Sequence, residues 1–184
     1  MREHVTALQA AGAFPCEVRR PADLDGLDGI VLPGGESTTM GKLLRIFDLI
    51  APLRDLVAAG LPTYGTCAGM ILLAAEVIDG RRDQELIGGL DITVRRNAFG
   101  SQVHSFEGDL RVADVGDVHG VFIRAPWVER AGPSVDVLAC VEEHPVAVRQ
   151  GHLLATSFHP ELTGSPAMHR YFVDTVIGDR GGQQ

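Results

Sequence analysis

Hydrophobic and polar residues follow two alternating patterns along the first half of the chain. Apolar side chains recur at helical spacing in three segments, which predicts helices over residues 3–11, 37–53 and 68–78. Ser37 or Thr38 is the expected N-cap of the second of these helices. Short strand-like runs lie beside these segments, at residues 16–19, 29–32 and 61–64. Buried strands that alternate with helices predict a parallel sheet covered on both faces.

Strand-like runs become closely spaced after about Leu86. They lie at residues 92–95, 103–112, 121–124, 135–141, 146–149 and 153–158, and a last helical pattern covers residues 167–177. Consecutive strands with short connections predict antiparallel additions to the sheet. The expected fold is a single α/β domain over residues 1–178, with an open, mostly parallel, flavodoxin-like sheet, followed by a polar tail at residues 179–184.

Charge and composition narrow the possible partners. The 184 residues include 16 Lys and Arg and 24 Asp and Glu, a net charge of −8, and no basic segment is concentrated enough to predict nucleic-acid binding. Residues 56–75 are uncharged, but Gly60, Pro62, Gly65 and Gly69 interrupt them. The first residues lack the apolar core of a signal peptide. Neither nucleic acid nor membrane is an expected partner.

The three cysteines are Cys16, Cys67 and Cys140, an odd number at wide spacing. This pattern predicts neither a disulfide framework nor a zinc site, and it is typical of a protein in the reducing cytoplasm. We interpret Cys16 and Cys140 as ordinary buried thiols. No metal or cofactor is expected.

Cys67 lies in the sequence Gly-Thr-Cys-Ala-Gly at residues 65–69, between a predicted strand and a predicted helix. A nucleophile between two such glycines is the form of a nucleophile elbow, in which a sharp turn raises the nucleophile above the sheet. The glycines are needed because the turn leaves no room for side chains. Cys67 is therefore a candidate nucleophile, and a small buried filler is the alternative.

His-Pro-Glu at residues 159–161 follows a strand-like run and offers a base for this cysteine. A nucleophilic cysteine needs a base, and the base needs a partner that holds its tautomer. Pro160 favours extended geometry before it, and side chains two apart on an extended segment share a side, so Glu161 can hold His159. The predicted triad is Cys67, His159 and Glu161, and a histidine exposed at a strand end is the alternative.

A glycine loop, Leu-Pro-Gly-Gly-Glu-Ser-Thr-Thr at residues 32–39, connects a predicted strand to a predicted helix. Its backbone NH groups could cradle an anion, either a phosphate or the oxyanion of an acyl-transfer intermediate. The loop lacks the glycine patterns of a P-loop and of a dinucleotide-binding fold, so nucleotide binding is not favoured. Beside a cysteine triad, an oxyanion hole is the better interpretation.

Five motifs occur in a fixed order: Pro-Gly-Gly-Glu-Ser-Thr at 33–38, Gly-Thr-Cys-Ala-Gly-Met at 65–70, Arg-Asn-Ala-Phe-Gly at 96–100, Phe-Ile-Arg-Ala-Pro at 122–126 and Phe-His-Pro-Glu at 158–161. Together they resemble the glutaminase subunits of pyridoxal 5'-phosphate synthase, within the triad (class I) glutamine amidotransferases. The third and fourth motifs are narrower than the others. Cys67 is followed by Ala-Gly-Met rather than by Leu-Gly and a Gln, which argues against the histidine, tryptophan and nucleotide branches.

The resemblance implies a role for each motif. Cys67 would attack the side-chain amide of L-glutamine, and His159, oriented by Glu161, would move the protons. The implied oxyanion hole consists of backbone NH groups near Gly34 or Gly35 and at Ala68.

The residues that the resemblance implies for glutamine binding are Gly35, Glu36, Ser37, Arg96, Ile123 and Arg124. Arg96 has a physical reason of its own, because a guanidinium can bind the carboxylate of the substrate. The same reason would fit Arg95 equally well.

The resemblance also implies a partner. This is a synthase subunit that condenses ammonia with ribose 5-phosphate and glyceraldehyde 3-phosphate into pyridoxal 5'-phosphate. Ammonia would pass through a protected tunnel in a hetero-oligomeric complex, so the glutaminase is expected to be weakly active alone and activated by docking.

The chain departs from the family pattern at three places. Ser101 stands where the family commonly has Arg, and His104 stands where it commonly has Asp. By the resemblance, a first strand and its Leu-Gln-Gly loop, roughly fifteen residues, would precede Met1, and the N-terminal strand is expected to be missing. Its loss would leave neighbouring strands with unpaired backbone groups. Either the true start of the chain lies upstream, or this chain is a truncated form.

Two other interpretations stay open. One is a stand-alone cysteine hydrolase on a similar sheet, which would need no His-x-Glu and would not share the narrow motifs. The other is a truncated, inactive regulatory or scaffold subunit, which the missing strand favours.

Overall fold

The computed structural model describes residues 1–80, 83–98 and 105–178. The departures at Ser101 and His104, the end of the motif at 96–100 and the predicted polar tail at 179–184 lie outside these residues. Among the described helices, none combines the length and the apolar character needed to cross a membrane.

A five-stranded sheet forms the centre of the fold. Its order is β1 (Ile30–Leu32), β2 (Thr63–Thr66), β10 (Leu153–Thr156), β9 (His144–Gln150) and β8 (Asp136–Val141). β1, β2 and β10 are parallel, whereas the β10–β9 and β9–β8 pairs are antiparallel. The predicted α/β fold is confirmed, and β8 and β9 are the expected antiparallel additions to this sheet. The run at 153–158 was also expected to be antiparallel, but β10 is parallel to β2, because it occupies the position between β2 and β9.

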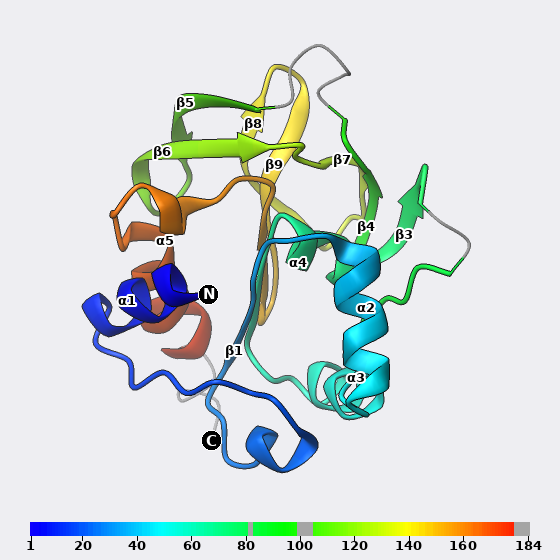
Figure 1. Ribbon diagram of the computed structural model, residues 1–184. Coiled ribbons are helices and arrows are strands. Elements are labelled where there is room, and N and C mark those ends of the chain that lie inside the picture. The colour runs from blue at the N-terminus through cyan, green and yellow to red at the C-terminus, as the bar shows by residue number, and fades with distance from the viewer. Residues whose placement is uncertain (81–82, 99–104, 179–184) are drawn as a thin grey trace.

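Helices lie on both faces of this sheet. Figure 1 shows α1 (Arg2–Ala10) and α5 (Ala167–Tyr171) on one side and α2 (Ser37–Ile46), α3 (Ile50–Ala58) and α4 (Ala68–Leu73) on the other. α5 continues in wider, π-type turns as η3 (Phe172–Ile177). Two short 3-10 turns, η1 (Pro21–Leu24) and η2 (Pro160–Leu162), complete the helical elements described.

The remaining strands form two smaller sheets. β3 (Ala74–Ile78) and β4 (Leu90–Arg95) are parallel, and β7 (Trp127–Ala131) is antiparallel to β4. β5 (Ser105–Val112) and β6 (Gly116–Ile123) form an antiparallel hairpin. Hydrophobic pattern alone did not predict β3 or β7.

The central sheet divides the interior into two cores because successive side chains of a strand point to opposite faces. On β10, Leu153 and Ala155 enter the core under α2, α3 and α4, whereas Leu154 enters the core under α5 and η3. Both cores are closely packed around fully buried side chains such as Leu72 and Phe172. The carboxyl ends of the parallel strands are thereby held between two layers of helices.

The predicted strand at residues 16–19 and the predicted burial of Cys16 and Cys140 are wrong. Residues 16–19 form no strand, and the described hydrogen bonds there are local, from the Arg19 backbone NH and side chain to Asp23 and Glu17. A strand needs a neighbouring strand to hydrogen-bond to. Residues 16–19 have no such neighbour in the described sheet, where β1 pairs with β2. Cys16 and Cys140 are exposed rather than buried.

The predicted helix over residues 37–53 is two helices, α2 and α3. Asp48 between them has a left-handed φ of 56°, a conformation that Asp adopts more readily than most residues, and the chain turns there. The N-cap of α2 is Glu36 rather than Ser37 or Thr38, because its carboxylate accepts hydrogen bonds from the NH groups of Thr38 and Thr39.

The predicted helix over residues 68–78 ends at Leu73. Residues 74–78 instead pair with β4, with Val77 opposite Val94. The β-branched side chains in this segment favour a strand, and pairing outweighs the helical pattern.

Two glycines bring the start of α4 close to the ends of β1 and β2. A Cβ atom on Gly65 would lie 2.5 Å from the carbonyl carbon of Gly69, and a Cβ atom on Gly69 would overlap the carbonyl oxygen of Leu32. Backbone atoms cannot move away as a flexible side chain can, so only glycine permits this approach.

Replacing Gly69 by Ala is expected to lower the free energy of unfolding by at least about 1–3 kcal/mol, because overpacking against backbone is relieved only by moving α4. Urea unfolding followed by circular dichroism measures the change.

Gly108→Ala is the matched control, since a Cβ atom there meets nothing within 4 Å. Equal midpoints for the two variants would contradict the packing argument.

Candidate active site

Cys67 occupies the junction between β2 and α4. Its φ of 49° and ψ of −100° lie outside the regions that L-residues usually adopt, and its backbone NH donates to the Thr156 carbonyl oxygen at 2.7 Å. Strained non-glycine residues persist only where the surroundings hold them, and here β10 and the two flanking glycines do so. The geometry is that of a nucleophile elbow.

His159 and Glu161 follow β10, the strand beside the one that leads to Cys67. The Nδ1 atom of His159 lies 2.9 Å from Oε1 of Glu161, and both residues are 9% exposed. The His159 backbone NH donates to the Val121 carbonyl oxygen at 2.8 Å, which fixes the turn against β6. The predicted contact is therefore present, but residues 160–162 form the 3-10 turn η2 rather than the extended segment that was expected.

The protonation of this pair depends on its buried contacts. Burial by itself would lower the pKa of His159, but hydrogen bonds with Cys67 and Glu161 outweigh burial and raise this pKa. Burial would likewise raise the pKa of Glu161, and hydrogen bonds from His159 and His4 lower it instead. The Cys67 thiol is therefore close enough to His159 to raise its pKa, and Glu161 is an ionised carboxylate.

Gly34 lies directly against this base, and Gly35 follows it in the same loop. A Cβ atom on Gly34 would overlap Cε1 of His159 and lie 2.8 Å from Nδ1. Gly35 has a φ of 149°, which side chains rarely permit. Ala68, the third residue predicted for an oxyanion hole, is the first residue of α4, where backbone NH groups have no partner within the helix.

Arg96 and Glu36 meet beside the glycine loop. The Arg96 guanidinium donates to Oε1 of Glu36 at 2.9 Å and to Oγ1 of Thr38 at 3.3 Å. Burial would raise the pKa of Glu36, but hydrogen bonds from the Thr39 and Thr38 NH groups lower it to about 2. Arg95 instead pairs with Asp79 and Glu129, so the structure distinguishes the two arginines where the sequence does not.

Ser37 is 2% exposed, and its hydroxyl donates to the Oε1 atom of Gln84 at 3.1 Å. The same Gln84 oxygen accepts from the Thr38 hydroxyl at 3.2 Å. Gln84 thus holds the start of α2 in place. Sequence reasoning missed Gln84, which belongs to no pattern, and it named Thr38 only as a possible N-cap and as part of the first motif.

The end of β6, at Ile123 and Arg124, lies beside Cys67. The Cys67 thiol lies 4.0 Å from the Ile123 carbonyl oxygen, and Arg124 has a left-handed φ of 44°. The Ala98 NH donates to the Ala125 carbonyl oxygen at 3.1 Å, which ties this turn to the segment after Arg96. The predicted site residues other than Arg124 therefore border Cys67, His159 or the glycine loop, and Arg124 directly follows Ile123 at the end of β6.

His4 and His169 are a further part of the site that sequence reasoning missed. Nε2 of His4 lies 3.2 Å from Oε1 of Glu161, and Nδ1 of His4 lies 2.9 Å from Nε2 of His169. One residue comes from the first helix and the other from the last, so no local spacing could predict their contact.

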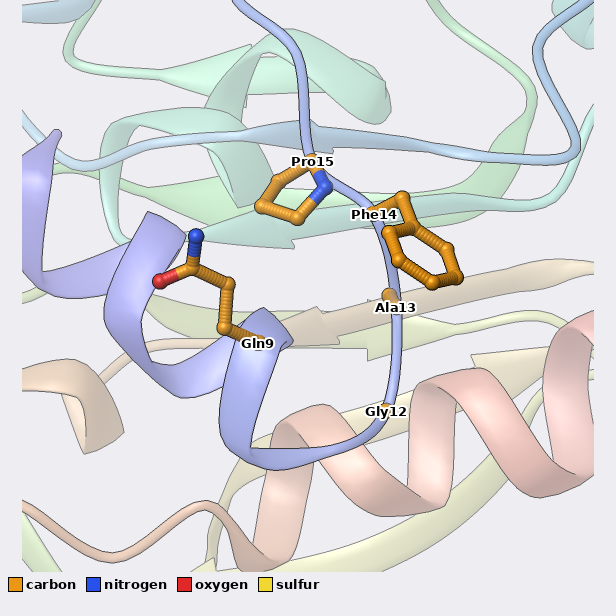
Figure 2. Close-up of a pocket in the computed structure, with 5 residues that line it drawn as sticks. All are labelled: Gln9, Gly12, Ala13, Phe14 and Pro15. Carbon is orange, nitrogen blue, oxygen red and sulfur yellow. The ribbon is translucent and has the colours of Figure 1, made fainter.

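A surface pocket lies apart from these residues, between α1 and the segment that follows it. Figure 2 shows Gln9, Phe14 and Pro15 around it, and Gly12 and Ala13 complete the described lining. None of these lining residues belongs to the predicted site. Phe14 is fully exposed.

Neighbouring parallel strands, one leading to a cysteine at a strand-to-helix turn and the next ending at a His-Glu pair, are the arrangement of a class I glutamine amidotransferase. A family model agrees: the chain belongs to the SNO glutamine amidotransferase family, which matches residues 1–178. The resemblance stated from the motifs is confirmed at this level.

Individual relatives are similar over nearly the whole chain. A pyridoxal 5'-phosphate synthase subunit PdxT from Parafrankia sp. (strain EAN1pec) is 66% identical over 183 residues, 98% of this chain and 90% of that protein. The protein of the same name from Frankia alni is 64% identical and covers 100% of this chain and 93% of its own length. A solved structure titled as a glutamine amidotransferase is 50% identical, with a TM-score of 0.91 over 96% of this chain and 93% of that chain.

Replacing Glu161 by Gln is expected to lower the free energy of unfolding at pH 7 by about 1.5–3 kcal/mol, the size of hydrogen bonds to a charged group. Because folding lowers the pKa of Glu161, its contribution is present above the unfolded value of 4.5 and is lost as the pH falls below it. The difference between parent and variant in urea unfolding should therefore narrow at about pH 3.5.

Glu143→Gln, which alters an exposed carboxylate, is the control for this series. A stability difference for Glu161→Gln that is the same at both pH values would contradict the assigned ionisation.

Proposed function

We propose that this chain hydrolyses L-glutamine to L-glutamate and ammonia, with Cys67 as the nucleophile. The observation that carries the proposal is the strained cysteine at the elbow, close enough to raise the pKa of a histidine that a buried carboxylate holds at 2.9 Å. Membership of a glutamine amidotransferase family supports glutamine as the substrate.

The reaction has two halves. In the first half the Cys67 sulfur attacks the side-chain amide carbon, the C–N bond breaks, and His159 gives a proton to the leaving nitrogen, so ammonia departs and a glutamyl thioester remains. In the second half His159 takes a proton from water, the resulting hydroxide attacks the thioester carbon, and glutamate leaves as the Cys67 thiolate is restored. Glu161 holds Nδ1–H of His159 throughout, which leaves Nε2 to exchange protons.

The oxyanion of each tetrahedral intermediate needs hydrogen-bond donors. Backbone NH groups of Gly34 or Gly35 and of Ala68 are the proposed donors, since these residues border His159 and Cys67. Loss of one donor of this kind typically lowers the rate by about 100- to 1000-fold.

The ends of the zwitterionic substrate fit the charges beside the glycine loop. Arg96 would bind the α-carboxylate, and Glu36 and the Ile123 carbonyl oxygen would accept from the α-ammonium group. Gly35, Ser37 and Arg124 shape this region through backbone conformation and the contact with Gln84.

The ammonia is delivered to a synthase subunit that makes pyridoxal 5'-phosphate, within a hetero-oligomeric complex in the cytoplasm. The names of the relatives from Parafrankia and Frankia support this partner. Direct transfer would keep ammonia away from protons of the solvent, and docking of the synthase would activate the glutaminase.

Cys67→Ala is expected to lower glutamine-dependent formation of pyridoxal 5'-phosphate by at least about 1,000-fold, because the nucleophile is lost. The assay mixes the protein with synthase, ribose 5-phosphate and glyceraldehyde 3-phosphate. Added ammonium salt should restore product formation, since the synthase itself is unaltered.

Cys140→Ala, which removes an exposed thiol, is the control and should retain activity. Product formation from glutamine by Cys67→Ala without ammonium would refute the nucleophile assignment. Glutamine hydrolysis that is equally fast without synthase would instead indicate a stand-alone hydrolase, and no hydrolysis by the parent would indicate an inactive scaffold.

Arg96→Ala should raise KM for glutamine by about 10- to 100-fold, because a charge-assisted hydrogen bond to the substrate is lost. Arg95→Ala is the matched control, since its contacts with Asp79 and Glu129 are elsewhere. Steady-state kinetics that gave both variants the same KM would contradict the substrate-binding role of Arg96.

A further inference from the structure

A line of buried polar side chains continues behind Glu161, away from Cys67. It runs from His159 through Glu161 to His4 and ends at His169, with separations of 2.9, 3.2 and 2.9 Å. His4 is 3% exposed and His169 is fully buried. Four titratable groups from α1, η2 and α5 therefore share one buried environment.

Glu161 depends on this line for its charge. A carboxylate removed from water needs donors in compensation, and both His159 Nδ1 and His4 Nε2 reach the same oxygen, Oε1. Within the described part of the chain, the other oxygen, Oε2, has no hydrogen-bond partner. His4 is thus half of the described compensation for this buried charge.

The proton positions follow from what each nitrogen can reach. Burial above all lowers the pKa of His169 to about 4, so His169 is neutral near pH 7. Its Nδ1 atom has no partner among the described residues. A buried lone pair without a partner costs less than a buried N–H without one, so the His169 proton is on Nε2 and points to His4 Nδ1.

His4 then has one arrangement that satisfies both of its nitrogens. Its Nδ1 atom accepts from His169, and its Nε2–H donates to Glu161, with the Thr66 hydroxyl 3.4 Å from the same nitrogen. The Tyr64 ring lies edge-on to His169, with centroids 5.7 Å apart, and closes the environment on the side of β2.

We propose that His4 is a positioning residue for glutamine hydrolysis: held by His169, it donates to Glu161 and so keeps the carboxylate ionised and aimed at His159. This inference rests on the proposed function, because it acts through the His159 base. It makes the first and last helices part of the active site, although neither touches the substrate.

The test compares His4→Ala and His4→Gln in the complex with synthase. His4→Ala should lower kcat for glutamine hydrolysis by about 10- to 100-fold, the usual effect of removing a group that orients a catalytic ligand, with KM changed less than about twofold. The loss of a donor disfavours ionised Glu161, so the acid limb of the pH–rate profile should move to higher pH. His4→Gln should restore most of kcat, because its amide NH can replace Nε2–H.

His152→Gln is the control, because His152 also bonds through Nε2, to the Val57 carbonyl oxygen at 2.9 Å, but outside this line. It should lose stability without a shift of the pH–rate profile. The inference would be overturned if His4→Ala kept kcat within about twofold of the parent and left the pH–rate profile in place. The proposed function would still stand in that case, provided that Cys67→Ala remained inactive. Glutamine hydrolysis by Cys67→Ala would overturn the proposed function, and this inference with it.

If His4→Ala does not fold, nitrogen-15 NMR of the histidine rings in the parent protein decides. The inference requires a proton on Nε2 of both His4 and His169 at neutral pH. A signal for a proton on Nδ1 of either ring would overturn it.

Discussion

The close contact between the start of α4 and the end of β1 is the constraint on which the site depends. Gly65 and Gly69 allow this contact, because a side chain on either would meet backbone. The chain between them must then turn within a few residues, and Cys67 takes up the strain with a φ of 49°. Its NH is bonded to β10, so the residue stays where the turn places it. Packing that looks purely structural thus determines the position of the nucleophile.

Close packing also determines the position of the base, His159. Gly34 lets the loop after β1 lie directly on the His159 ring, and the His159 backbone NH is bonded to the Val121 carbonyl oxygen of β6. Glu161 is buried behind it, which makes the carboxylate a strong partner and also one that needs further donors. The first helix brings His4 next to the carboxylate, and His169 from α5 contacts His4 in turn. Parts of the chain that are far apart in sequence therefore surround the buried charge of Glu161.

The sequence predicted what depends on local rules. The elbow around Cys67, the His159–Glu161 contact and the parallel strands β1 and β2 all follow from short motifs and continuous apolar runs, whereas β10 was expected to be antiparallel and is parallel to β2. Features that depend on pairing between distant residues were missed. Residues 74–78, for example, were predicted as part of a helix, but they pair with β4 as the strand β3. Arg95 and Arg96 differ only in the partners that folding brings to them, and the His4–His169 contact has no local signal.

The central claim is that Cys67 forms a covalent bond with the glutamyl group during turnover. Acid quenching of the complex while it hydrolyses glutamine, followed by peptide mass spectrometry, tests this directly, and the exposed Cys16 and Cys140 serve as internal controls. The account predicts a glutamyl adduct on the peptide that contains Cys67 and on neither other cysteine. An adduct on Cys16 or Cys140, or rapid hydrolysis with no adduct at Cys67 even when the second half-reaction is slowed, would contradict it.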